Sequence, residues 1–130
     1  LIDESYNANP SSTSMAIKDF SKIKTKNKKY FILGDMLELG QKTKNYHKFI
    51  SKQINNSDVD KAFTYGENTL MTFKNLKNDK KGNILQNIND FDFLMKDFIQ
   101  NNDYIMIKGS NASGVNKISR SFILGNKNAL

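Results

Sequence analysis

Three polar segments of this 130-residue chain carry side chains that could bind a small charged ligand. The last of them, Lys108-Gly109-Ser110, places a cation, a residue without a side chain and a hydroxyl directly after the apolar run Tyr104–Ile107. An ammonium beside a helix N-terminus suits an anion, because both offer hydrogen-bond donors and positive charge. A lysine that only extends its ammonium from a sheet edge into solvent would not need the Gly-Ser that follows. We therefore predict an anion site at this segment.

The second polar segment follows the apolar run Tyr30–Leu33 and begins with Gly34 and Asp35. Glycine lets backbone or ligand approach closely, and the aspartate adds a negative charge there. Two interpretations of Asp35 stay open. It could bind a ligand, or it could cap the turn Met36–Leu39, with Glu38 completing a capping-box-like pair. Glu38 itself is interpreted as structural.

The first polar segment runs from Asp3 to Pro10, and the proline suits the first turn of a helix. Carboxylates and amides in such a segment could bind ribose hydroxyls or an adenine edge, and a tyrosine could stack on the base. A helix cap needs only one polar side chain. The segment contains six, which favours a binding role: Asp3, Glu4, Ser5, Tyr6, Asn7 and Asn9.

The elements that must position these segments alternate between strands and helices. Apolar runs predict five strands. The first ends at Asp3, and the others span Tyr30–Leu33, Asp60–Tyr65, Asn83–Gln86 and Tyr104–Ile107. Helical spacing predicts helices at Ser11–Ile23, Thr43–Asn55, Asn68–Leu76, Asn89–Ile99 and Ser113–Leu124, with Met15, Phe49 and Leu70 among the inward-facing residues. This alternation predicts an α/β fold of the Rossmann-like, three-layer type, a mostly parallel sheet with helices on both faces. Right-handed crossovers put the carboxyl ends of the strands along one edge, so we expect the three polar segments to meet there.

Composition argues against several other classes of protein. No apolar run approaches the ~20 residues that cross a bilayer, and the absence of cysteine excludes disulfides and thiolate metal sites. The single histidine, His47, lies among apolar residues and is interpreted as a packed core residue, so no metal site is predicted. We expect one soluble, cytoplasmic domain over residues 1–130, cut from a longer protein.

The net charge of +7 could indicate a nucleic-acid-binding module, the alternative from another functional class. The lysines are scattered through predicted turns and polar helix faces, however, without an interleaved aromatic stripe. A solvated surface explains that pattern, and we expect no nucleic-acid partner. The chain also contains neither G-x-x-x-x-G-K-[ST] nor G-x-G-x-x-G, so phosphate handling by an enzyme built on this domain would need residues elsewhere.

Three motifs together resemble signatures of the C-terminal domain of the Mur ligases, in the branch that adds D-alanyl-D-alanine. They are Ile2-Asp3-Glu4-Ser5-Tyr6-Asn7-Ala8-Asn9-Pro10, Leu33-Gly34-Asp35-Met36-Leu37-Glu38-Leu39-Gly40 and Lys108-Gly109-Ser110, and the likeness extends over essentially the whole chain. The sequence departs from the family pattern at Glu4, where a second aspartate is usual, at Asn111, where an arginine is common, and at Asn116, where a glutamate is usual.

The resemblance implies the third domain of an ATP-dependent amide ligase of peptidoglycan precursor synthesis, which would close over the nucleotide and bring in D-alanyl-D-alanine. ATP and Mg²⁺ would be bound mainly by a central domain, and UDP-MurNAc-tripeptide by the other domains. The fragment alone would contain no catalytic residue and be inactive, and the enzyme would be a monomer. An alternative is the third domain of another Mur-type ligase or of a folylpolyglutamate-synthetase-type ligase; those relatives usually carry a histidine-containing loop in place of Tyr6–Pro10.

The resemblance also implies site residues. Lys108 with Ser110 would hold the dipeptide carboxylate, and Asp35 would orient its amine. The residues implied for D-alanyl-D-alanine are Asp35, Met36, Lys108, Ser110 and Asn111, and those implied for the nucleotide are Asp3, Glu4, Ser5, Tyr6, Asn7, Asn9 and Pro10.

Overall fold

The computed structural model describes residues 1–4, 8–37, 39–110 and 113–117, and within these ranges it contains a five-stranded sheet. The strands are β1 (Ile2–Glu4), β2 (Lys29–Gly34), β3 (Lys61–Tyr65), β4 (Lys81–Leu85) and β5 (Tyr104–Lys108). Every pairing is parallel, and the spatial order is β1-β5-β2-β3-β4. β5 therefore lies between the strands that precede the first two polar segments.

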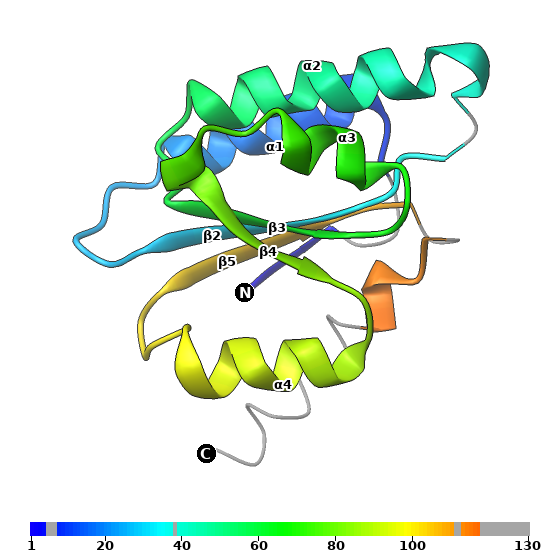
Figure 1. Cartoon of the computed structure of the whole chain (residues 1–130). Coiled ribbons are helices and arrows are strands. Elements are labelled where there is room, and N and C mark those ends of the chain that lie inside the picture. The colour runs from blue at the N-terminus through cyan, green and yellow to red at the C-terminus, as the bar shows by residue number, and fades with distance from the viewer. Residues whose placement is uncertain (5–7, 38, 111–112, 118–130) are drawn as a thin grey trace.

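Four α-helices connect these strands in the described part of the chain: α1 (Pro10–Ser21), α2 (Thr43–Asn55), α3 (Thr69–Lys74) and α4 (Ile88–Asp97). Two short 3₁₀ helices, η1 (Gly40–Lys42) and η2 (Asn78–Lys80), precede α2 and β4. Figure 1 shows α1, α2 and α3 on one face of the sheet and α4 on the other. The predicted three-layer α/β architecture is confirmed.

The central strands are buried on both faces, as their uninterrupted apolar sequences predict. Along β2, Phe31 and Leu33 pack beneath α1 and α2, whereas Tyr30 and Ile32 face the opposite core. On that second face, the rings of Tyr30, Phe63 and Phe98 lie with centroids 5.3–6.0 Å apart in edge-on contacts. Such contacts favour a fixed arrangement of rings. The sheet is therefore a rigid base for the loops at its ends.

Helix boundaries lie within a few residues of the predictions. α4 begins at Ile88, one residue earlier than predicted, because Asn87 caps it, and it ends at Asp97 instead of Ile99. α2 spans Thr43–Asn55 as predicted, and α1 begins at Pro10, one residue earlier than predicted, because Asn9 caps it. α1 ends at Ser21 instead of Ile23. β4 begins two residues before the predicted start, at Lys81. Of the predicted last helix, residues 118–124 lie outside the described part, and Val115 is buried as expected.

Three predicted inward-facing residues are exposed instead: Met15 at 59%, Leu70 at 45% and Phe49 at 41%. Short polar side chains take their places in the core, among them Thr13 of α1 and Thr72 of α3. The Thr72 hydroxyl donates to the backbone carbonyl of His47, so its burial leaves no unpaired group. Hydrophobic spacing correctly placed Ile17, Phe20, Ile50 and Ile54 in the core, but it missed these polar residues because it ignores such partners.

Candidate functional site

The three polar segments meet at one edge of the sheet, as predicted. β1, β5 and β2 are adjacent and parallel, and the register pairs Lys108 with Glu4 on one side and with Leu33 on the other. The segments that leave these strands therefore start side by side. Figure 1 shows the connections after β2 and β5 emerging at the same edge. We call this edge the three-loop junction; it comprises Ala8, residues 35–37 and residues 108–110.

Ser110 links all three segments. Its N–H donates to the carbonyl of Asp35 at 3.2 Å, its Oγ accepts from the N–H of Leu37 at 3.1 Å, and the same Oγ donates to the carbonyl of Ala8 at 3.4 Å. A serine hydroxyl has one proton to give. In this geometry that proton goes to Ala8, so Ser110 fixes the loops to one another through the group that was expected to meet the substrate anion.

Replacing Ser110 by alanine should lower the free energy of unfolding by about 1–3 kcal/mol, because it strips partners from the Leu37 N–H and the Ala8 carbonyl. Urea denaturation followed by circular dichroism would measure the loss. Ser14→Ala is the matched control, since the Ser14 hydroxyl donates to the side chain of Gln53, between α1 and α2 and away from the three loops. Equal losses in the two variants would show that Ser110 is not a junction residue.

Asp35 caps a helix, but that helix is α3 and not the turn Met36–Leu39. Its carboxylate Oδ1 accepts from the N–H of Thr69 at 3.0 Å, and the backbone of Asn68 also hydrogen-bonds to it. Asn68, at the N-cap position of α3, makes no capping bond with its own side chain. The N–H groups of Met36 and Leu37 donate elsewhere, to His47 and Ser110. The alternative that Asp35 caps a helical turn is thus confirmed, but the capped element is α3 and not the turn that follows Asp35 in sequence.

Burial raises the pKa of the Asp35 carboxyl above its ordinary value, and the hydrogen bonds from Thr69 and Asn68 oppose that rise. The residue is 9% exposed and counts as buried. The carboxylate lies at the start of α3, beside Gly66, and a carboxylate fixed in this way by backbone donors can receive a cationic group. Glu38, interpreted as structural, lies outside the described residues.

Lys108 ends β5 and is 4% exposed. Side chains alternate along a strand, so Lys108 lies on the same face as Met106, toward α1. Buried lysines are rare unless their charge has partners, and Lys108 does make further contacts. The junction therefore combines a buried cation on β5 with a buried carboxylate just after β2.

Met36 was expected among the dipeptide-binding residues, and the structure places its side chain in the core. Its sulfur accepts from the Thr13 hydroxyl at 3.6 Å. Its N–H donates to Nε2 of His47 at 3.2 Å. In the described part of the chain, Met36 thus anchors the turn through its side chain and its N–H.

His47 is fully buried, which confirms the interpretation as a packed histidine with satisfied hydrogen bonds. Nδ1 lies 2.9 Å from the carbonyl of Thr43, one helical turn earlier, and Nε2 accepts from Met36. Sequence reasoning missed this contact with the candidate site. The His–Thr spacing of four residues was visible, but it indicates only the contact within α2.

The N-terminal segment is described only in part. Asn9 caps α1: its Oδ1 accepts from the N–H of Ser12 at 2.8 Å, and its N–H donates to the Ser12 hydroxyl at 3.1 Å. Pro10 occupies the first helical position. These two expected nucleotide-binding residues thus shape the helix start. Ser5, Tyr6, Asn7 and Asn111, together with the side chains of Asp3 and Glu4, lie outside what the structure describes.

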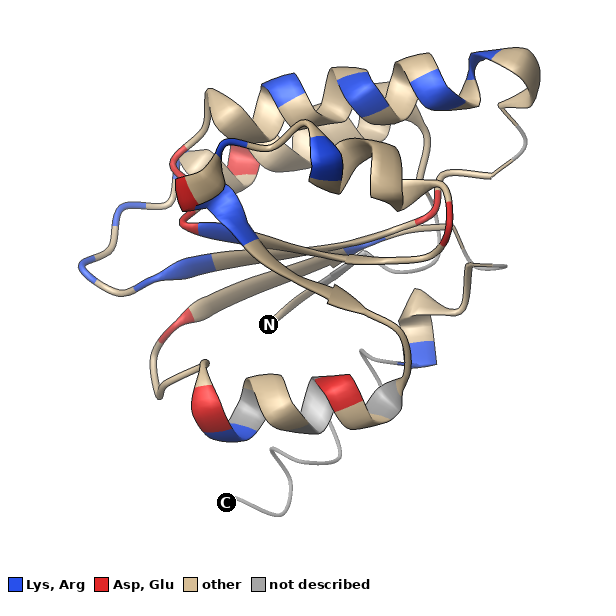
Figure 2. Ribbon diagram, in the orientation of Figure 1, with Lys and Arg blue, Asp and Glu red and all other residues tan. Residues whose placement is uncertain are grey.

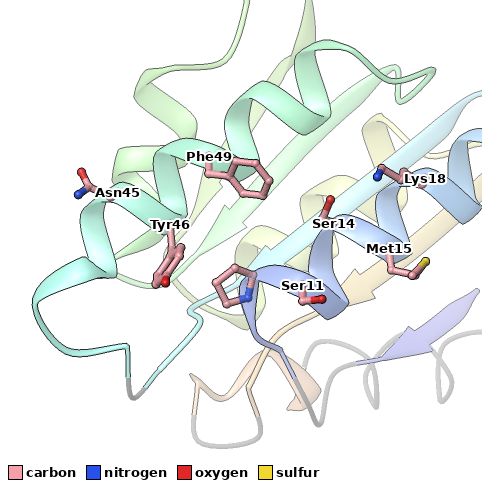
Figure 3. A pocket seen from close by; sticks show the side chains of 8 residues that line it. Ser11, Ser14, Met15, Lys18, Asn45, Tyr46 and Phe49 are labelled. Atoms are coloured by element: carbon pink, nitrogen blue, oxygen red, sulfur yellow. The ribbon is translucent and has the colours of Figure 1, made fainter.

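A groove of about 520 Å³ runs between α1 and α2, beside the junction. Figure 3 shows Tyr46 and Phe49 of α2 across the groove from Ser11 and Ser14 of α1. Its lining is mainly apolar, with Lys18 and Asn45 as the more polar members. It offers few groups for chemistry, and we do not assign it to the site.

Two other kinds of site are absent from the described ranges. No group of three or more histidine, aspartate or glutamate side chains there is placed to hold a metal ion. None of the helices in those ranges has the length and apolar character needed to cross a bilayer.

Comparison with known proteins connects this geometry to a family. The family described as "Mur ligase, glutamate ligase domain" matches residues 1–111. UDP-N-acetylmuramoyl-tripeptide–D-alanyl-D-alanine ligase of Bacillus subtilis (strain 168) is 30% identical over 126 residues, covering 95% of this chain and 28% of the relative. The enzyme of the same name from Buchnera aphidicola subsp. Acyrthosiphon pisum (strain APS) is 30% identical over 128 residues, covering 98% of this chain and 27% of the relative. The chain thus spans about a quarter of the length of these curated relatives.

A solved structure shares the fold. MurF ligase from Thermotoga maritima, crystallised in complex with ADP, superposes with a TM-score of 0.76 at 19% identity, covering 91% of this chain and 26% of that one. The parallel sheet, the junction of its three motif-bearing loops and the family match over residues 1–111 lead to one conclusion: this chain belongs to the Mur ligase family, as its C-terminal, glutamate ligase domain.

Proposed function

We propose that this chain is the C-terminal domain of an ATP-dependent ligase that adds D-alanyl-D-alanine to UDP-MurNAc-tripeptide. The observation that carries the proposal is the set of hydrogen bonds between Ser110 and the backbone of Asp35, Leu37 and Ala8, which joins the three motif-bearing segments. Relatives with that enzymatic name align with nearly the whole chain.

The charges at the junction suit the two ends of the dipeptide. At neutral pH, D-alanyl-D-alanine carries a carboxylate at one end and an amine at the other. We assign the dipeptide carboxylate to Lys108 and to Asn111, three residues further along the sequence. We assign the amine to Asp35, whose carboxylate the α3 backbone holds in place. Ser110 and Met36 contribute by fixing the loops that carry those charges. The amine must lose its proton before it attacks, and a fixed carboxylate can orient it while it does so.

In the proposed reaction, ATP phosphorylates the terminal carboxylate of UDP-MurNAc-tripeptide, and the dipeptide amine attacks the acyl phosphate. The tetrahedral intermediate releases phosphate and leaves a peptide bond. We propose that the segment Asp3–Pro10 meets the nucleoside of ATP, in line with the ADP bound to the Thermotoga maritima ligase. The chain has no P-loop sequence, so we assign the phosphates and Mg²⁺ mainly to the rest of the ligase. Closure of this domain would keep water from the acyl phosphate.

We further propose that the ligase works as a monomer in the cytoplasm, where its nucleotide substrates are made, and without nucleic acid. Figure 2 shows lysines distributed over α2, α3 and the strand starts, on several sides of the described fold. A nucleic-acid interface would need them gathered on one surface. Low-salt gel shifts with DNA and RNA should therefore give no retarded band.

The proposed activity is tested with the full-length ligase that contains this chain. Phosphate release in the presence of ATP, Mg²⁺ and UDP-MurNAc-tripeptide should depend on D-alanyl-D-alanine. D-glutamate, L-glutamate and meso-diaminopimelate, offered in its place, should give only background rates. Activity with one of those amino acids and not with the dipeptide would assign the chain to another Mur-type or a folylpolyglutamate-synthetase-type ligase.

A further inference from the structure

We propose that His47 is a positioning residue that holds the Asp35–Met36 turn in its binding geometry through a neutral imidazole protonated at Nδ1. The inference rests on the proposed function in one respect, that this turn meets the dipeptide. From the sequence, His47 was interpreted as a packed core residue. The proposal is based on the hydrogen bonds that this fully buried side chain makes in the folded structure.

The contacts fix the tautomer without ambiguity. The backbone carbonyl of Thr43, 2.9 Å from Nδ1, can only accept a hydrogen bond, so Nδ1 must carry the proton. The backbone N–H of Met36, 3.2 Å from Nε2, can only donate, so Nε2 must present its lone pair. A neutral imidazole has one donor and one acceptor, and both are used on backbone groups. His47 therefore bridges the first turn of α2 and the turn after β2.

Two further hydrogen bonds join the Asp35–Met36 turn and His47 to α3. The hydroxyl of Thr72 donates to the His47 carbonyl, and the N–H of Thr69 donates to the Asp35 carboxylate. α3 thus holds the histidine backbone with one residue and the aspartate with another. Loss of the bond between Met36 and His47 would free the turn next to the carboxylate that we assign to the substrate amine.

Protonation of the imidazole would break this arrangement. A proton on Nε2 would point at the Met36 N–H, so two donors would face each other. Burial lowers the pKa of His47 below its ordinary value, while the Thr43 carbonyl and the charge of Asp35 oppose that shift. In the described part of the chain, Asp35 is the charged group that acts on the imidazole, and Glu67 acts in turn on Asp35.

The direction of the pH dependence follows. The unfolded chain takes up the proton near pH 6.5 and the folded chain only at lower pH. The protein is therefore fully stabilised by this group above about pH 6.5 and loses stability as the pH falls from there to the lowered folded pKa. We call the two hydrogen bonds of the His47 ring, to Thr43 and from Met36, the His47 clamp. The His47 clamp should open only below the folded pKa of the imidazole.

Two amide variants separate a positioning role from a packing role in the full-length ligase. The oxygen of His47→Gln can reach the place of Nε2 and accept from Met36. The amide of His47→Asn reaches only the place of Nδ1 and leaves Met36 without an acceptor. We expect His47→Asn to raise the KM for D-alanyl-D-alanine about tenfold, as for one lost hydrogen bond, with the KM for ATP unchanged, and His47→Gln to restore most of the loss. Equal effects of both variants on both KM values would overturn the proposal.

A measurement on the unmutated ligase covers variants that fail to fold. The 130-residue chain contains one histidine, so histidine labelling confined to this segment of the ligase gives the imidazole nitrogens of His47 alone by NMR. The expected spectrum at pH 7 is that of the neutral form protonated at Nδ1, with titration below pH 6.5. An Nε2-protonated ring or an imidazolium at pH 7 would overturn the proposal. This result is independent of the substrate, so failure of the dipeptide assay would count against the proposed function and not against the clamp.

Discussion

Replacing Lys108 by methionine should lower kcat/KM of the full-length ligase for D-alanyl-D-alanine by about 10–100-fold. Hydrogen bonds to charged groups contribute about 1.5–3 kcal/mol, and each 1.4 kcal/mol is a factor of ten. Lys108 is buried at the end of β5, where solvent screens its charge weakly. Methionine keeps the length and apolar stem of the side chain and removes the ammonium. Steady-state kinetics with the dipeptide as the varied substrate would measure the change.

The chain offers a matched control at the opposite edge of the sheet. Lys29 begins β2, is 5% exposed, and donates its ammonium to the carbonyl of Ser21. Lys29→Met removes a similarly buried ammonium at the first residue of β2, whereas the three-loop junction follows the last residue of that strand. It should lower stability and leave the KM for the dipeptide unchanged. If the two variants changed the KM equally, or if Lys108→Met did not change it, Lys108 would not be the carboxylate ligand.

Replacing Gly66 by alanine should lower the free energy of unfolding by about 2–4 kcal/mol. Gly66 has φ +120°, which L side chains rarely adopt, and strained backbone of this kind costs about 1–3 kcal/mol. A Cβ there would also lie 2.5 Å from Cγ and Oδ1 of Asp35. The carboxylate would have to move, and its bond to the N–H of Thr69 would weaken. Urea denaturation measures the total loss, and hydrogen exchange at the Thr69 amide reports the broken cap.

Gly40→Ala separates the cost of the backbone conformation from the cost of displacing the Asp35 carboxylate. Gly40 has φ +62°, and nothing lies within 4 Å of the place a Cβ would take. That variant should cost about 1–2 kcal/mol from the left-handed backbone alone. It should leave the exchange rate of the Thr69 amide unchanged. Equal destabilisation by the two substitutions, with Thr69 protected in both, would show that Gly66 does not make room for Asp35.

The sequence determined the frame of this domain. The apolar runs of β2 and β5 can be satisfied only by burial on both faces, which a parallel sheet between helix layers provides. Asn9 and Pro10 specify the start of α1 through short-range hydrogen bonds and a fixed φ, and the structure begins the helix there. Because crossover handedness is nearly invariant, the convergence of the three polar segments on one edge was also predictable.

Only the tertiary structure decided how the polar side chains within that frame are used. Asp35 bonds to Thr69, 34 residues later, and Ser110 bonds to Ala8, 102 residues earlier. His47 is the packed core residue that the sequence predicts, but its bond to the Met36 N–H also depends on a distant segment. A local pattern records which groups can donate or accept, whereas the partner depends on which loops folding brings within about 3 Å of one another. The sequence was therefore sufficient to predict which segments meet at this edge of the sheet. The hydrogen bonds that shape the site there depend on the packing of segments that are distant in sequence.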